Sequence, residues 1–321
     1  MRVARSLTSR DVVVEELPDP VAGPGEVVCR VLACGVCGSD VSETYVSRKL
    51  PGVLGHEVVG EVLEAGAGVG GVRAGDRVVI HHHVPCGRCR RCRRGHETLC
   101  EQFRATALDP GGFAERVRLS PPLVGELLDL GALDPVAGTF VEPLGCVLRA
   151  LDRAGLRPGD ALLVVGAGSN GLLAVAAAHA RGVDSVWIRE PREDRRGIAQ
   201  ALGGASHADE PIDVAFVTTS HAGAIAGAAA ALAIGGTLCL YATTGPGIGL
   251  GLDTEQLFLR ELTVCSSWSA GPGDMRAAHE LIASGRIDVL PFVTHRLGLD
   301  DTAWALDLQR RGEALKAVVL P

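Results

Sequence analysis

The chain has 321 residues, 47% of them hydrophobic, and a formal net charge of -7 at pH 7. This length suggests two domains with a sizeable core, and the acidic balance argues against a general nucleic-acid binder. No apolar run approaches the roughly 20 residues needed to span a bilayer, and residues 1–10 lack the apolar segment of a secretion signal. We therefore expect a soluble cytoplasmic protein without nucleic-acid or membrane partners.

Two further features of the composition bear on the compartment and the chemistry. The ten cysteines fit a cytoplasmic location if most of them are metal ligands or buried thiols. Lysine occurs only at Lys49 and Lys316, whereas arginine is abundant. We attribute this imbalance to codon bias and infer no function from it.

The first part of the chain is rich in short valine runs separated by glycine and proline. The clearest runs are 27–32, 58–63, 77–80 and 114–119. Such runs predict short strands joined by turns. We therefore predict a β-rich domain over residues 1–145, completed by residues from about 288 to 321, where 315–320 forms a further strand.

Four cysteines follow the third of these strands with the spacing C-x2-C-x2-C-x7-C: Cys86, Cys89, Cys92 and Cys100. Four thiolates so close together can complete a tetrahedral shell around Zn²⁺ and leave no position for water. The spacing predicts a structural zinc site, and removal of the ion should unfold this segment. Five arginines lie among the ligands, and in an acidic chain we interpret them as solvated charge rather than as a nucleic-acid site.

Three consecutive histidines, His81, His82 and His83, precede the four cysteines. Adjacent residues of a strand point to opposite faces, so all three side chains cannot reach one metal ion. We assign them a structural role on this geometry.

Strands and helices alternate in the second part of the chain. Strands are predicted over 161–165, 185–188, 214–218 and 237–241, with helices to about 181 and over 192–202 and 222–233. This alternation predicts parallel βαβ units of a doubly wound sheet over residues 146–287. The stretch between Leu202 and Asp213 is too short for another βα unit, and the apolar segment 262–268 is predicted to be an edge strand between subunits.

A glycine-rich turn follows the first strand of this region and opens a helix. Its residues are Gly166, Gly168, Ser169, Asn170 and Gly171. In this context G-x-G-x-x-G predicts a dinucleotide site, because the glycines let the pyrophosphate approach the helix N-terminus. Glu190 ends the next strand, where an acid bonds the ribose 2′-hydroxyl and favours NAD over NADP. Arg189, Arg192 and Arg195 lie nearby and leave NADP open.

A second metal site is predicted from separated pieces. Cys37 lies in C-G-V-C-G-S-D, His56 and Glu57 lie in G-H-E, and Glu142 lies in V-E-P-L. A thiolate, an imidazole and a carboxylate provide three ligands for a catalytic zinc and leave one position open. Each piece alone is common in proteins and usually structural.

Together with the four-cysteine segment, G-G-F-A-E and G-A-G-S-N-G, these pieces stand in the order of a known family. The chain resembles zinc-dependent medium-chain alcohol and polyol dehydrogenases, in the sorbitol and threonine dehydrogenase branch. The resemblance covers essentially the whole chain. It implies an α/β protein with a GroES-like β-rich catalytic domain and a Rossmann NAD(P)-binding domain, and a homodimer or homotetramer.

The resemblance implies that Cys37 and His56 are ligands of the catalytic zinc, with Glu57 or Glu142 as the third. Asp40 matches the carboxylate that orients the ligand imidazole. By family position, Cys146 lies near the nicotinamide ring of the cofactor.

Ser39 matches the hydroxyl group that carries the substrate proton away. The family often has histidine where this chain has Ser42, and serine cannot accept a proton at neutral pH as imidazole does. The resemblance therefore leaves the last proton acceptor open between the cofactor ribose, water and a nearby group such as Tyr45.

The implied activity is hydride transfer between NAD(P) and a secondary alcohol such as a polyol, cyclitol, sugar or amino-alcohol, with one catalytic and one structural zinc per chain. The alternative is a zinc-stabilised binding or regulatory protein of the same fold without turnover. Ser42 and the short second domain motivate that alternative, and the intact ligand and glycine motifs argue against it.

Overall fold

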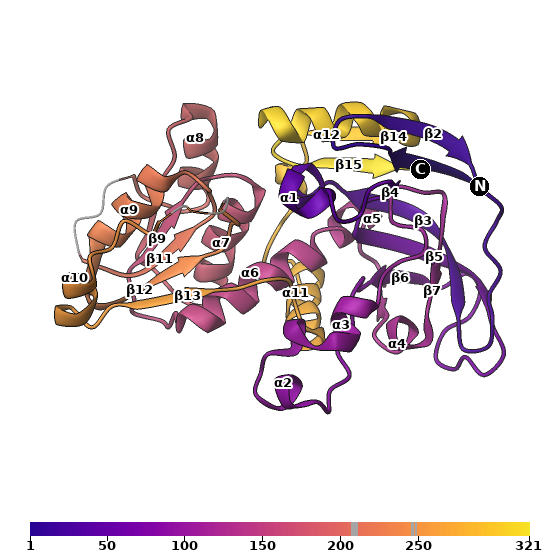
Figure 1. Cartoon of the computed structure of the whole chain (residues 1–321), viewed down its shortest axis with the longest axis horizontal. Coiled ribbons are helices and arrows are strands. Elements are labelled where there is room, and N and C mark those ends of the chain that lie inside the picture. The colour runs from indigo at the N-terminus through magenta and orange to yellow at the C-terminus, as the bar shows by residue number, and fades with distance from the viewer. Residues whose placement is uncertain (207–210, 245–246, 248) are drawn as a thin grey trace. The chain divides into compact units, whose positions relative to one another are not determined.

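The computed structural model describes residues 1–206, 211–244, 247 and 249–321, which form two compact units (Figure 1). The first unit contains residues 1–143 and 271–321, and the second contains residues 144–270. The chain re-enters the first unit at Gly271, earlier than the predicted residue 288. The reason is helix α11 (Pro272–Ala283), which packs against α5 (Pro135–Gly138) of the first unit and buries Met275, Ala278, Leu281 and Ile282.

A seven-stranded sheet forms the centre of the first unit, in the order β14-β15-β3-β5-β6-β8, with β7 paired to β3. Its strands are β3 (Val27–Gly35), β5 (Glu57–Ala65), β6 (Arg77–Ile80), β7 (Arg116–Leu119), β8 (Leu128–Asp129), β14 (His295–Gly298) and β15 (Ala317–Leu320). The C-terminal strand β15 pairs antiparallel with β3, so the chain end completes this unit.

A smaller antiparallel sheet, β2-β1-β4, lies in the same unit and was not predicted. Its strands are β1 (Arg2–Ser6), β2 (Val12–Glu16) and β4 (Gly52–Val53). The remaining elements are the helices α1 (Glu43–Val46), α2 (Arg90–Arg93), α3 (Glu101–Ala105), α4 (Pro121–Val124) and α12 (Thr302–Arg311), with 3-10 turns η1 (Gly38–Val41), η2 (Glu97–Leu99), η3 (Leu290–Phe292) and η4 (Leu299–Asp301).

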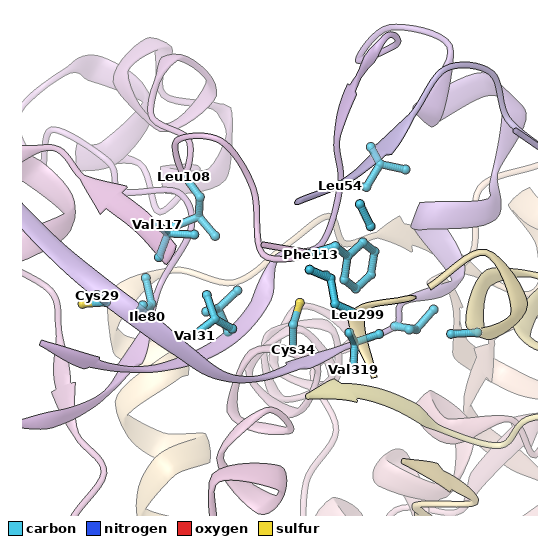
Figure 2. Packing of buried hydrophobic residues seen from close by; sticks show 14 of the residues in the cluster. Cys29, Val31, Cys34, Leu54, Ile80, Leu108, Phe113, Val117, Leu299 and Val319 are labelled. Atoms are coloured by element: carbon cyan, nitrogen blue, oxygen red, sulfur yellow. The ribbon is translucent and has the colours of Figure 1, made fainter. Parts of the chain in front are cut away.

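The core of the first unit holds the end of β3 in place. Figure 2 shows Cys34 beneath the ring of Phe113, with Leu299 and Val319 close by. All four side chains are at most 2% exposed. Because Gly35 pairs with Glu57 at the start of β5, this packed region fixes the two segments that carry Cys37 and His56.

The second unit contains a five-stranded parallel sheet in the order β10-β9-β11-β12-β13. Its strands are β9 (Leu162–Val165), β10 (Val186–Arg189), β11 (Ile212–Val217), β12 (Leu232–Leu240) and β13 (Thr263–Ser266). Its helices are α7 (Ser169–Ala180), α8 (Glu193–Ala201), α9 (Ala222–Ala231) and α10 (Thr254–Leu259), and α6 (Val141–Ala154) enters it from the first unit. The predicted fold class, a β-rich domain plus a doubly wound parallel sheet, is confirmed.

Two details of the second unit depart from simple βαβ alternation. Helix α9 ends at Ala231 rather than at 233, and β12 already begins at Leu232, with a register irregularity against β11 between Leu232 and Thr237. The stretch between Leu202 and Ile212 contributes one bridge, from Ala205 to Trp187, and its residues 207–210 lie outside the described structure. Strand β10 is therefore an edge of the sheet.

Across the described residues, no helix combines the length and the apolar character needed to cross a membrane.

Candidate functional site

The four cysteines converge on short turns of the first unit. The Sγ atoms of Cys86, Cys89, Cys92 and Cys100 lie within 4.8 Å of one another. Burial would raise the pKa of Cys100, but backbone N–H groups of Cys86 and Phe103 outweigh it and lower this pKa to about 6. A thiolate held by backbone amides is a suitable zinc ligand, so the donor set fits a structural zinc ion.

A second cluster brings together Cys37, His56 and Glu57, whose candidate ligand atoms also lie within 4.8 Å of one another. Asp40 accepts a hydrogen bond from the backbone N–H of Cys37 (3.0 Å), and its Oδ1 lies 3.3 Å from His56 Nδ1. This contact leaves Nε2 of His56 for a metal ion. The Oγ atom of Ser39 lies 3.5 Å from the same Nε2.

One carboxylate oxygen in this cluster has no hydrogen-bond partner. Glu57 is 1% exposed; its Oε2 accepts a hydrogen bond from Lys316 Nζ, while its buried Oε1 has no partner among the described residues. Gly35 makes room for this carboxylate, because a Cβ atom at residue 35 would lie 1.9 Å from Oε2. An unpaired buried oxygen beside a thiol and an imidazole fits a zinc ligand, since such an atom is otherwise costly.

Lys316 was not predicted as part of the site, and it is 2% exposed. Burial alone would lower the pKa of Lys316, but Glu57, Cys37 and Glu142 together raise it. The ammonium group therefore lies among three groups that are candidate zinc ligands and balances their charge.

Replacing Lys316 by Met should destabilise the protein, because it leaves a buried carboxylate without its cation. Breaking a buried ion pair from one side costs about 3–5 kcal/mol. We expect a fall of this order in the free energy of unfolding, measured by urea denaturation. Lys316→Arg, which keeps the charge, should lose less stability. The double variant Lys316→Met/Glu57→Gln should recover part of the stability that Lys316→Met loses. Equal unfolding midpoints for Lys316→Met and the unchanged protein would exclude this role.

Glu142 and His82 lie beside the cluster. Glu142 is in the first turn of α6, and its Oε1 lies 3.9 Å from Nδ1 of His82. The His82 ring centroid is 4.9 Å from that of His56. Burial holds the pKa of His82 well below its usual value and lowers that of His83 to about 4, so both rings are neutral at pH 7.

The structural role predicted for the three histidines rested on strand alternation, which does not apply to them. Strand β6 ends at Ile80, and the chain then turns. His82 lies beside Glu142 and His56 but is not one of the three residues grouped as possible metal ligands, so its structural role stays a prediction.

Tyr45 and Lys49 form a polar pair on and just after α1. The Lys49 ammonium lies 2.6 Å from the Tyr45 hydroxyl and 4.3 Å from the ring centroid. Burial would raise the pKa of Asp40, but His56 and the backbone of Cys37 lower it, and the charge of Lys49 adds to this lowering. Burial is the main cause of the low pKa of His82, and Lys49 adds to that as well. Ser42, where the family often has histidine, immediately precedes α1. Tyr45 and Lys49 therefore lie shortly after this position in the sequence.

The glycine-rich turn has the geometry of a dinucleotide loop. It connects β9 to α7, and a Cβ atom on Gly171 would lie 1.9 Å from the backbone oxygen of Gly166. Glu190 Oε2 accepts a hydrogen bond from the N–H of Ala167 (2.7 Å), and its Oε1 accepts one from the N–H of Arg192 (2.9 Å). The carboxylate is thus fixed against the loop, where a ribose would lie in a Rossmann site.

Thr218 adds a residue that the sequence analysis missed. It follows β11, the neighbour of β9, and its hydroxyl donates to the backbone oxygen of Gly166 (3.1 Å). The sequence did contain a signal for Thr218: it is a polar residue at the carboxyl end of the strand that neighbours the strand before the glycine-rich turn. Cys146 lies on α6 in the same unit and is buried.

Comparison with known proteins identifies the family. Residues 23–127 match the alcohol dehydrogenase GroES-like domain. Sorbitol dehydrogenase of Bacillus subtilis (strain 168) is 30% identical over 355 aligned positions, covering 100% of this chain and 97% of that protein. The chain belongs to the zinc-dependent medium-chain dehydrogenase family. L-threonine 3-dehydrogenase of Pyrococcus abyssi is 33% identical, with 97% of this dehydrogenase and 94% of that protein covered.

A solved structure agrees with this assignment. A protein of Sinorhizobium meliloti 1021 described as a zinc-binding dehydrogenase and bound to NADP superposes with a TM-score of 0.88 at 28% identity, covering 100% of this dehydrogenase and 99% of that chain. The predicted family and the predicted enzyme class, an NAD(P)-linked zinc dehydrogenase, are confirmed. Nothing in these relatives favours a binding protein without turnover.

Proposed function

We propose that this dehydrogenase oxidises a secondary hydroxyl group of a polyol, cyclitol, sugar or amino-alcohol, with NAD as the acceptor. The observation that carries the proposal is the convergence of Cys37, His56 and Glu57, whose ligand atoms lie within 4.8 Å, with one Glu57 oxygen unpaired. Named relatives that act on sorbitol, L-threonine and D-altritol support a substrate with more than one polar group.

Each residue of the cluster has a proposed role. Cys37, His56 and Glu57 would hold the catalytic zinc, with Glu142, which lies beside His82, as the alternative third ligand, and the four-cysteine site would hold the structural zinc. When bound, the catalytic ion supplies Lewis acidity to a substrate hydroxyl, and NAD(P) supplies the hydride acceptor. Ser39, 3.5 Å from His56 Nε2, is positioned to accept the substrate proton and pass its own onward.

The side chains around the cluster support a polar substrate. His82, His83, Glu142 and Lys316 are buried polar residues of the same unit. Neutral imidazoles donate and accept hydrogen bonds, and a site built from such groups rejects substrates that leave them unpaired. A substrate with several hydroxyl or amino groups satisfies them better than a simple alkyl alcohol does.

The direct test is a substrate panel read by the absorbance of reduced nicotinamide. It should contain polyols, cyclitols, sugars and amino-alcohols beside simple primary alcohols, each with NAD and with NADP. We expect turnover with at least one secondary alcohol that carries several polar groups, at a higher kcat/KM than with any primary alcohol. Activity limited to primary alcohols would contradict the proposed substrate class.

Glu190 should set the preference for NAD. A hydrogen bond to a charged group contributes about 1.5–3 kcal/mol, and each 1.4 kcal/mol is about tenfold in affinity. We therefore expect Glu190→Ala to lower kcat/KM for NAD by at least about tenfold and to leave the value for NADP nearly unchanged. Glu193→Ala, an exposed acid at the start of α8, is the matched control. An unchanged ratio of the two kcat/KM values would exclude Glu190 as the discriminating residue.

We further propose that the chain associates with itself through the edge strand β13. Among the described residues β13 is the last strand of its sheet, and an edge strand can pair with another chain; the same unit also exposes apolar side chains such as Ile234 and Phe258, each 80% exposed. Native mass spectrometry should show a dimer or tetramer, and Ile234→Asp/Phe258→Asp should shift it toward monomer. Leu7→Asp, in the first unit, should not. A monomer for the unchanged protein would refute the assignment.

The cysteines support a cytoplasmic location. All ten are free thiols in the structure, and nine of them lie in the two proposed metal sites or are buried. Such thiols persist in a reducing compartment.

A further inference from the structure

Two cysteines of the second unit lie side by side and have no part in the zinc sites. Cys239 on β12 pairs with Cys265 on β13 in the parallel register, and Figure 1 shows the two strands as neighbours. Neighbouring strands lie about 4.8 Å apart, which is within the Cα–Cα range of disulfides and short of its most common value. The two thiols can therefore be joined without moving either strand far.

The two thiols differ in chemical character. A hydrogen bond with Cys265 and burial both raise the pKa of Cys239, whereas the same hydrogen bond lowers the pKa of Cys265. Arg153 on α6 adds to the lowering, and its Nε donates to the backbone oxygen of Ser266 (2.7 Å), which holds the guanidinium beside β13. The Cys265 thiol is therefore the more acidic of the two.

The exposure of the two sulfurs matches these characters. Cys239 is fully buried, and its Sγ lies 3.6 Å from the backbone oxygen of Ala150 on α6. Cys265 is partly exposed on the edge strand. A small oxidant can reach Cys265 first, and the neighbouring Cys239 is already in place to complete the reaction.

We propose that Cys265 and Cys239 form a reversible thiol-oxidation site that closes to a disulfide between β12 and β13. Its oxidant is a peroxide such as hydrogen peroxide. The Cys265 thiolate attacks one peroxide oxygen and becomes a sulfenic acid, and the leaving hydroxide takes a proton to become water. The Cys239 sulfur then attacks the Cys265 sulfur, the S–S bond forms, and the departing hydroxide takes the Cys239 proton. Two thiols and one peroxide thus yield one disulfide and two waters.

Glutathione should reopen this bond, because Cys265 is partly exposed and its sulfur can be reached by a small thiol. Pairing of β13 with another chain would use backbone groups in the plane of the sheet. The side chains of Cys239 and Cys265 stand perpendicular to that plane, so self-association would leave the two thiols side by side.

The test is a peptide map of the zinc-loaded protein after one equivalent of hydrogen peroxide and alkylation of the remaining thiols. The expected result is a predominant Cys239–Cys265 linkage within one chain, lost after treatment with glutathione. Cys239→Ser should stop the reaction at the sulfenic acid of Cys265, trapped with dimedone. Cys29→Ser, a buried cysteine of the first unit, is the control and should keep the linkage.

Several outcomes would overturn the proposal, and they can be read on the unchanged protein, whether or not a variant folds. They are a linkage of Cys239 to Cys146, a linkage of Cys265 to a second chain, or oxidation of the zinc-site cysteines while Cys265 stays alkylated. None of these readouts uses enzyme activity, so the result is independent of the proposed substrate and mechanism.

Discussion

Cys37→Ser should remove one of two zinc ions per chain and lower turnover by at least about 10³-fold. A serine hydroxyl replaces a thiolate poorly as a zinc ligand. The Lewis acidity of the ion is worth several kcal/mol in the transition state, and each 1.36 kcal/mol is about tenfold in rate. Zinc content by elemental analysis and NAD-linked turnover should therefore fall together. Circular dichroism should remain unchanged, because Cys37 lies on the loop before η1 and outside the two cores.

A matched control separates this effect from a general effect of losing a cysteine. Cys265→Ser replaces a partly exposed thiol of the second unit that belongs to neither metal cluster. It should keep two zinc ions and full turnover under reducing conditions. Full activity of Cys37→Ser with one zinc ion retained would defeat the proposed mechanism.

Cys100→Ser should remove the other zinc ion and unfold the segment around the four cysteines. This segment has a small core of its own, formed by Cys92, Cys100 and Phe103. Zinc binding to four such ligands contributes about 10–16 kcal/mol in small zinc domains, far more than this core can supply. The loss should be local, because the large sheet of the unit does not include these turns.

Trypsin offers a sensitive readout of this local unfolding. Five arginines, Arg88, Arg90, Arg91, Arg93 and Arg94, lie within the zinc-binding segment. In the folded, zinc-loaded segment, α2 and the ligand turns protect their peptide bonds, and in Cys100→Ser they should be the first sites cut. Cys29→Ser should keep the slow cleavage of the unchanged protein. Equal cleavage rates for Cys100→Ser and the unchanged protein would show that the ion is not structural.

The sequence predicted the elements whose signals are local. The run 77–80 became β6 with the same bounds, and the glycine-rich turn lies between β9 and α7 as predicted. The four cysteines lie close together, as expected for residues separated by so few positions in the sequence. Strands β1 and β2 were missed, since β1 contains two arginines and its register is set by distant partners such as β4.

The parts of the site that depend on long-range contacts could not be read from local patterns. Lys316 and Glu57 are far apart in sequence and meet only because β15 pairs with β3, which pairs with β5. One feature of the composition was attributed to codon bias and given no weight. The chain uses arginine almost everywhere, and its only two lysines, Lys49 and Lys316, both act on the candidate site. The Lys316 ammonium is a compact charge on a flexible stem, which lets it reach the buried Glu57 carboxylate.

The central claim is that a zinc ion is held by Cys37, His56 and a glutamate in the first unit, separately from the four-cysteine site. Anomalous diffraction from crystals of zinc-loaded protein, recorded on both sides of the zinc absorption edge, tests it most directly. We predict two peaks per chain, one among the four cysteines and one bonded to Cys37 Sγ and His56 Nε2 with a carboxylate oxygen of Glu57 or Glu142. A single peak, or a second peak bound elsewhere, would contradict the account.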